Sequence, residues 1–214
     1  MTNGSIRSTV LMCVALISIV VVLFVHKVMQ TPSLDETALR ELGVVFLPTP
    51  RALIVDGLTT DGGAAFTTQS LEGAWTFLFF GFTNCPDVCP TTMAELGNAK
   101  RELVQSLPEI ARQMRVVLVS VDPERDDAQT LGRYVRAFSP DFIGVNGSRE
   151  SIARFATQVN VAFGKVPDNE GGYTVDHSGN IVIVNPHGHY QGFIKLPHKA
   201  TTIHDTMISL VERY

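Results

Sequence analysis

The stretch AWTFLFFGFTNCPDVCPTTM, residues 74–93, contains a strand pattern, a cysteine pair and a helix start in direct succession. Residues 74–82 are apolar and largely aromatic, which is typical of a strand buried on both faces of a sheet. From Thr91 onward apolar residues recur near helical spacing. Cys85 and Cys89 are therefore expected between a buried strand and a helix, at the end of the strand where open α/β sheets usually bind ligands.

The rest of the chain continues the alternation of strands and helices. Residues 114–121 form a second continuous apolar run. NIVIVN (180–185) and YQGFIK (190–195) are separated by a tight turn, which predicts an antiparallel hairpin. This order predicts a single α/β domain with a mixed central sheet and the thioredoxin-type order of elements. The other elements that we expect are a short hairpin from 51–57 and 62–71, and helices over 127–138, 152–159 and 203–211.

An apolar stretch lies near the N-terminus. Residues 9–25 are uncharged, and their length of about 17 residues is at the short end of the range for a membrane-spanning helix. Arg7 precedes the stretch and acidic residues follow it, which favours an anchor with its N-terminus on the cytoplasmic side. We therefore expect one N-terminal transmembrane helix, and a cleaved signal peptide is the alternative.

The length of 214 residues allows one domain with a sizeable core plus an appendage. We expect a membrane anchor in residues 1–27, a linker in 28–47 and one folded domain in 48–214. Pro48 and Pro50 mark the end of the linker, because proline opposes regular structure.

The composition excludes some classes of protein. The net charge is -4 and there is no basic cluster, which argues against nucleic acid as a partner. Three cysteines are too few for a small domain held together by disulfides. Cys13 lies within the apolar N-terminal stretch and is expected only to pack there. The other two cysteines are the pair whose role has to be explained.

Cys85 and Cys89 are expected at a helix N-terminus, where the unpaired N–H groups and the helix dipole lower the pKa of a thiol. Their spacing allows a disulfide or a shared soft metal ion. Thiolates select Cu(I) or zinc, and a neutral imidazole is the usual companion. A loop histidine is more often solvated, and His187 and His189 are expected at the surface of a turn, so spacing alone leaves the third ligand open. The candidates are His177, His187, His189, His198 and His204.

Three stretches in the same order resemble the Sco/SenC family of copper chaperones. They are FFGFTNCPDVCPTTMAEL (79–96), VLVSVDPERD (117–126) and YTVDHSGNIVIVNPHG (173–188). The resemblance covers roughly residues 46–212. It implies a thioredoxin-like fold, and it implies that Cys85, Cys89 and His177 correspond to the two cysteines and the histidine that bind copper.

The same resemblance implies a function. A member of this family would be a membrane-anchored metallochaperone that holds one copper ion per domain and delivers it to the dinuclear copper centre of cytochrome c oxidase. Its partners would be the copper-accepting subunit of the oxidase, an upstream copper donor and a thiol reductant. The domain would lie on the periplasmic or extracytoplasmic side of the cytoplasmic membrane. Metal binding would be the activity, and an enzymatic reaction is not implied.

A membrane-tethered thiol:disulfide oxidoreductase is the main alternative, with Cys85 and Cys89 forming a disulfide. Thioredoxin-type oxidoreductases have two residues between their cysteines and a cis-proline opposite them. Here the spacing is three residues, and TVDHS (174–178) stands where that proline is sought, which favours metal binding. A copper-independent adaptor is a third hypothesis, and it requires that the site residues be replaceable without a phenotype.

Three acidic residues are candidates for supporting roles. Asp122 and Asp126 resemble a carboxylate pair of the family, and Asp87 lies between the cysteines. Carboxylates are too hard to be preferred Cu(I) ligands, so we expect these residues around the ligands or at a docking surface. Roles in turns and helix caps are the alternative. Phe82 and Tyr173 are expected to line the site and keep it dry.

Overall fold

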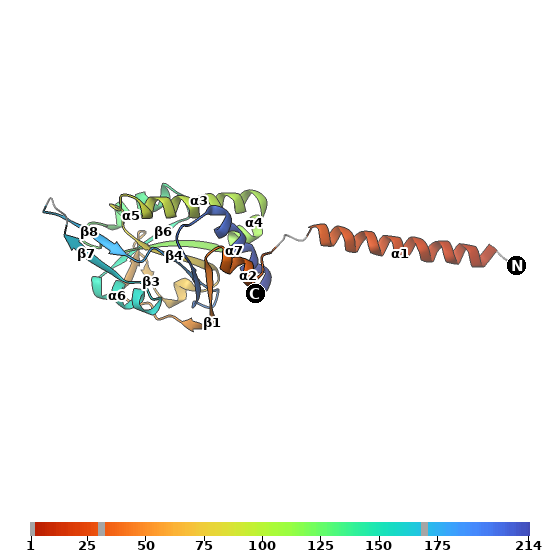
Figure 1. Cartoon of the computed structure of the whole chain (residues 1–214), viewed down its shortest axis with the longest axis horizontal. Coiled ribbons are helices and arrows are strands. Elements are labelled where there is room, and N and C mark those ends of the chain that lie inside the picture. Colours follow the sequence, from red (N-terminus) through yellow and green to blue (C-terminus); the bar gives the residue numbers. More distant parts are fainter. Residues whose placement is uncertain (1–2, 30–32, 168–170) are drawn as a thin grey trace. The chain divides into compact units, whose positions relative to one another are not determined.

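The structure is a computed structural model, and it describes residues 3–29, 33–167 and 171–214 (Figure 1). The chain forms two compact units, residues 1–33 and 34–214. The first unit contains a single long helix, α1 (Asn3–Met29). The second unit contains the sheets and the other helices, including both cysteines of the pair.

α1 covers the apolar stretch 9–25, so the prediction of a helix in this region is confirmed. Among the residues that the structure describes, we find no helix that combines the length and the apolar character needed to cross a membrane. The predicted membrane-spanning helix is therefore not supported. The uncharged stretch extends about 26 Å at the helical rise, which is less than a hydrocarbon core of about 30 Å.

The second unit is built on an eight-stranded sheet with the order β1-β10-β9-β4-β5-β6-β2-β3. β4, β5 and β6 are parallel, whereas their outer neighbours pair antiparallel, so the predicted mixed sheet is confirmed. The strands are β1 (Val44–Ala52), β2 (Leu58–Thr60), β3 (Ala65–Phe66), β4 (Trp75–Gly81), β5 (Met114–Ser120), β6 (Ile143–Gly147), β9 (Ile181–Val184) and β10 (His189–Ile194).

β4 is the centre of the core, and all of its residues are buried. It lies between β5 and β9, and helices cover both faces of the sheet: α3 and α5 on one side and α6 on the other (Figure 1). Phe80 packs against Phe155 of α6, with 5.5 Å between the ring centroids. The helices are α2 (Glu36–Glu41), the 3-10 helix η1 (Thr68–Leu71), α3 (Val88–Ser106), α4 (Pro108–Arg112), α5 (Ala128–Arg136), α6 (Arg149–Gln158) and α7 (Ala200–Arg213).

Local capping explains where two helices begin. The Asp127 carboxylate accepts a hydrogen bond of 2.7 Å from the Thr130 N–H at the start of α5. The Ser148 hydroxyl accepts one of 3.1 Å from the Ser151 N–H at the start of α6. Such bonds satisfy N–H groups that have no partner within the helix. α3 begins at Val88, earlier than expected, so Cys89 lies in its first turn.

The N-terminal part of the domain differs from the prediction. The stretch 28–47, expected as a linker, contains α2 and the start of β1, and residues 30–32 lie outside the described residues. Pro48 and Pro50 lie within β1, at the point where its register with β10 shifts. An edge strand tolerates proline at such an irregularity, because the missing N–H is not needed for the ladder. The expected hairpin is present, but its first strand is β2 and not 51–57.

A second, two-stranded antiparallel sheet is formed by β7 (Phe163–Pro167) and β8 (Tyr173–His177), which the sequence patterns did not predict. Figure 1 shows this hairpin at one end of the domain. Residues 168–170, between its strands, lie outside the described part of the chain. His177, expected in a loop, is the last residue of β8.

Candidate metal centre

The two cysteines lie where β4 ends and α3 begins. Cys85 is in the connecting loop and partly exposed, and Cys89 is in the first turn of α3 and fully buried. The Cys89 N–H donates to the Cys85 sulfur over 3.4 Å. Gly81, the last residue of β4, leaves room for the buried thiol, because a Cβ there would lie 2.9 Å from Cys89 Sγ.

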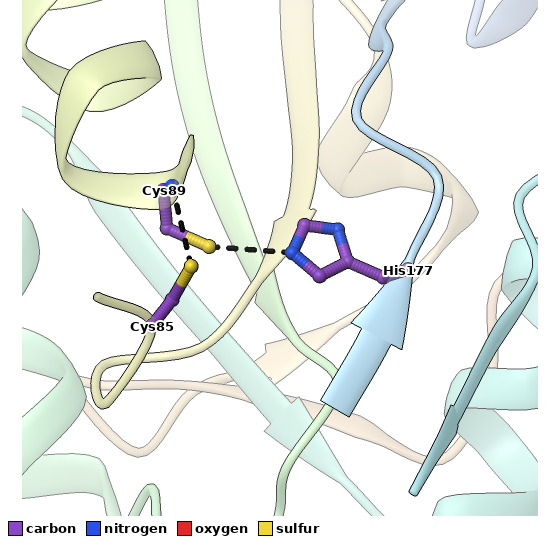
Figure 2. Close-up of side chains that lie close together, drawn as sticks. All are labelled: Cys85, Cys89 and His177. Carbon is purple, nitrogen blue, oxygen red and sulfur yellow. Dashed lines mark hydrogen bonds between the residues drawn. The ribbon is translucent and has the colours of Figure 1, made fainter. Parts of the chain in front are cut away.

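His177 faces the cysteine pair from β8 (Figure 2). Its Nε2 atom lies 3.4 Å from Cys89 Sγ. The donor atoms of Cys85, Cys89 and His177 all lie within 4.8 Å of one another. Across the described residues, this is the group of His, Cys, Asp and Glu side chains that comes close enough to hold a metal ion.

The imidazole of His177 is held by its surroundings in a form suited to metal binding. Its ring makes edge-on contacts with Phe79 and Phe82, at centroid distances of 5.8 Å and 5.9 Å. Nδ1 lies 3.2 Å from the Ser178 carbonyl, so Nδ1 carries the proton and Nε2 presents a lone pair to the sulfurs. Burial lowers the pKa of His177, which keeps the ring neutral at neutral pH.

The expected lowering of the thiol pKa is wrong for Cys89. Burial is the largest effect and raises the pKa of this thiol, and its contact with Cys85 raises it further. Desolvation of a fully buried sulfur therefore outweighs the helix dipole. Cys89 keeps its proton until a cation replaces it.

Asp126 fastens the loop that leads into the cysteine pair. Its buried carboxylate accepts hydrogen bonds from the Ser120 hydroxyl at 2.7 Å, the Thr83 N–H at 3.1 Å and the Thr83 hydroxyl at 2.5 Å. Burial raises the pKa of Asp126, although these donors oppose the rise. Thr83 lies two residues before Cys85, so its bonds to Asp126 orient the loop that carries Cys85.

The other two acidic residues have different environments. Asp122 is fully buried, pairs with Arg125 and accepts a hydrogen bond of 2.9 Å from the Tyr173 hydroxyl. Asp87 is the N-cap residue of α3, exposed and without a side-chain bond to the helix end. The burial of Asp122 and Asp126 favours a role around the ligands over docking, and for the exposed Asp87 docking stays a prediction.

The other four candidate histidines lie outside the donor group. His187 is exposed, as expected, and His189 is partly buried, with 6.1 Å between their ring centroids. His198 is buried, and its Nδ1 lies 2.9 Å from the Thr92 hydroxyl of α3. Its Nε2 lies 3.3 Å from the Ile194 carbonyl, so His198 joins two elements of the core. His204 is next to the Asp205 carboxylate, at 3.0 Å.

Sequence reasoning missed two contributors to this site. Phe79 was expected only as a core residue, yet its ring also contacts His177. Arg125 had no expected role, although it stands within the VDPERD stretch, and the structure places it on Tyr173. Its position inside a stretch already singled out was the available signal.

Comparison with known proteins agrees with this arrangement. A protein of Stutzerimonas stutzeri named as copper-binding is 38% identical over 169 residues, which are 78% of this chain and 81% of that protein. The mitochondrial SCO1 homolog 1 of Arabidopsis thaliana is 33% identical over 157 residues. These are 73% of this chain but 46% of that protein, so the chain spans under half of its length.

The fold is also found in a solved structure. The crystal structure of Arabidopsis thaliana ScoI with copper bound superposes with a TM-score of 0.68 at 32% sequence identity, over 78% of this chain and 98% of that chain. The predicted thioredoxin-like fold is thereby confirmed. The SCO1/SenC family model matches residues 57–212, most of the folded unit. By these matches, the chain belongs to the SCO1/SenC family.

Proposed function

We propose that the protein is a copper chaperone in which Cys85, Cys89 and His177 bind one copper ion as cargo. The observation that carries this proposal is the convergence of two sulfur atoms and one imidazole nitrogen within 4.8 Å. Soft thiolates with an imidazole suit Cu(I), and no carboxylate belongs to the donor group. The related ScoI structure with copper bound supports the choice of copper over zinc.

The exposure of the ligands favours transfer by ligand exchange. Cys85 is partly exposed, whereas Cys89 is fully buried. An incoming ligand of a partner would therefore replace Cys85 first, and the buried ligands would release the ion last. We propose the copper-accepting subunit of cytochrome c oxidase as the acceptor, on the basis of family membership. Binding and release constitute the activity, and no catalytic step is needed.

A copper titration of the full-length protein tests this proposal. The reduced protein should bind one copper ion in competition with a chelator, and the protein with an oxidised Cys85–Cys89 pair should bind none. Cys85→Ser or His177→Ala should abolish stoichiometric binding, because each removes one of three donors. His187→Ala, which changes an exposed histidine outside the group, is the control. Full affinity in the His177→Ala protein would contradict the assignment of the third ligand.

A second candidate function is thiol:disulfide exchange, and one observation favours it. Cys85 is the more accessible of the two thiols, because it is partly exposed whereas Cys89 is buried. Cys85 would attack a disulfide of the acceptor, and Cys89 would resolve the mixed disulfide, so that two electrons pass to the acceptor. Cys89→Ser should then trap a mixed disulfide, whereas a copper chaperone alone forms none. A thiol reductant and an upstream copper donor would restore the loaded state.

We also propose that α1 attaches the protein to the cytoplasmic membrane, with the domain on the extracytoplasmic side. In support, the apolar side chains of α1 that the structure describes, from Val10 to Phe24, are exposed. Protease treatment of intact spheroplasts, which digests only extracytoplasmic domains, checks the orientation.

A further inference from the structure

The position of His177 depends on a strand that the main sheet does not hold. In the described part of the chain, β8 pairs with β7 alone, and neither strand is hydrogen-bonded to the eight-stranded sheet. Side chains on a strand alternate between its faces, so Tyr173, Val175 and His177 share one face. Val175 is buried, which identifies this as the face that packs on the domain. The contacts of its side chains therefore decide where His177 lies.

Arg125, in the loop between β5 and α5, contacts Tyr173, which lies on this face at the end of β8 opposite His177. Its guanidinium carbon lies 4.0 Å from the centroid of the Tyr173 ring and 5.9 Å from that of Phe82. Its Nη1 donates to the Tyr173 carbonyl over 3.1 Å. The same guanidinium pairs with buried Asp122, which also accepts the Tyr173 hydroxyl at 2.9 Å.

These contacts link the two sides of the site. Phe82 contacts both Arg125 and the His177 ring, and Tyr173 begins the strand that His177 ends. A cation on β7 adds to the same cluster, since Lys165 Nζ lies 4.1 Å from the Tyr173 ring and 3.3 Å from the Glu124 carboxylate. The hairpin is thus attached to the β5–α5 loop through both of its strands.

We propose that Arg125 is a positioning residue for His177: through Tyr173 and Asp122 it clamps β8 so that the imidazole faces the two sulfurs. This inference rests on the proposed copper role of the site. The planar guanidinium is required, because it stacks on the ring and bonds the carbonyl and the carboxylate at the same time. Changes to outer partners of metal ligands typically weaken metal affinity by roughly 10- to 100-fold.

Arg125→Lys in the full-length protein is the sharpest test. It keeps a cation beside the buried Asp122 carboxylate but removes the planar guanidinium that stacks on the Tyr173 ring. We expect copper affinity to fall by roughly 10- to 100-fold. The contribution of the imidazole nitrogen to the X-ray absorption spectrum of the copper-loaded protein should weaken. In the metal-free protein, the amides of 173–177 should lose protection from hydrogen exchange. Arg149→Lys is the matched control, since Arg149 bonds Glu124 at 3.1 Å but is not part of the contacts to Tyr173.

The outcomes separate this inference from the proposed function. If the unaltered protein does not bind copper, the proposed function is wrong. The proposed role of Arg125 in copper binding is then wrong as well. If the unaltered protein binds copper, but Arg125→Lys and Arg149→Lys have the same copper affinity or the same hydrogen exchange, only the proposed role of Arg125 is wrong. The proposed function then stands. Tyr173→Leu removes the clamp from the other side, and it provides the same comparison if Arg125→Lys does not fold.

Discussion

Gly81 illustrates how a single residue sets the geometry of the site. It ends β4 where the buried Cys89 thiol packs against the strand, and a Cβ at this position would lie 2.9 Å from both Cys89 Sγ and a carbon of the Phe79 ring. Both neighbours belong to the site, since Phe79 also contacts His177. The absence of a side chain at position 81 therefore allows the Cys89 sulfur and the Phe79 ring, which contacts His177, to lie close together.

Gly81→Ala should accordingly destabilise the domain and disturb the site together. Overpacking of a core typically costs about 1–3 kcal/mol of unfolding free energy. Chemical denaturation measures this loss, and a copper competition assay should show weaker binding. Gly62→Ala is the control, because the nearest atom to a Cβ there is the Thr60 hydroxyl oxygen, at 3.8 Å. Equal stability of the two variants would show that the sulfur and the ring move aside without cost.

At the scale of elements, His198 joins the segment before α7 to the start of α3. Its ring is buried, and its two nitrogens lie next to the Thr92 hydroxyl and the Ile194 carbonyl. It also contacts Phe79 edge-on, at a centroid distance of 6.3 Å. His198 thus supports the same ring that packs on His177, without entering the donor group.

This environment predicts a pH dependence of stability. Burial lowers the pKa of His198 in the folded protein, so below about pH 6.5, the ordinary histidine pKa, the unfolded chain binds a proton more readily. The free energy of unfolding should therefore fall as the pH decreases from about 6.5 toward the lower pKa of the folded state. His177 contributes with the same sign. Denaturation of His198→Gln at about pH 7 and pH 5 should show a smaller fall than that of the unaltered protein.

The element scale also explains which strands the sequence predicted. β4 and β5 were recognised because a strand buried on both faces is apolar at successive positions, which is a local pattern. β1 was missed because its prolines suggested a linker, while its pairing with β10 comes from the far end of the chain. β7 and β8 were missed because neither has a run of buried positions, and they pair only with each other in the described chain.

At the scale of the whole molecule, the division after Ser33 assigns α1 to one unit, and Cys85, Cys89 and His177 to the other. The folded unit begins with Leu34, whose N–H donates to the Ser209 hydroxyl of α7 over 3.0 Å. α2 follows and buries Leu39 completely. The domain therefore includes residues that the sequence pattern assigned to a linker.

Two truncations test this boundary. A chain that starts at Leu34 should keep the unfolding free energy of the full-length protein within about 0.5 kcal/mol, because no core residue is removed. A chain that starts at Val44 lacks α2 and the buried Leu39, and should lose about 2–5 kcal/mol, the usual cost of removing a large core side chain. Chemical denaturation compares them. Equal stability would show that α2 does not belong to the folding unit.

By itself, the sequence determined the mixed α/β order and placed Cys85 and Cys89 at the junction of β4 and α3, because these features depend on neighbouring residues. The resemblance to a family implied His177 as the third ligand, but only the tertiary structure shows how it meets the two cysteines. His177 is 88 residues from Cys89 and reaches it through a hairpin that no local pattern predicted. The direction of the Cys89 pKa also depended on the fold, because burial of the sulfur by distant parts of the chain outweighs the dipole of its own helix.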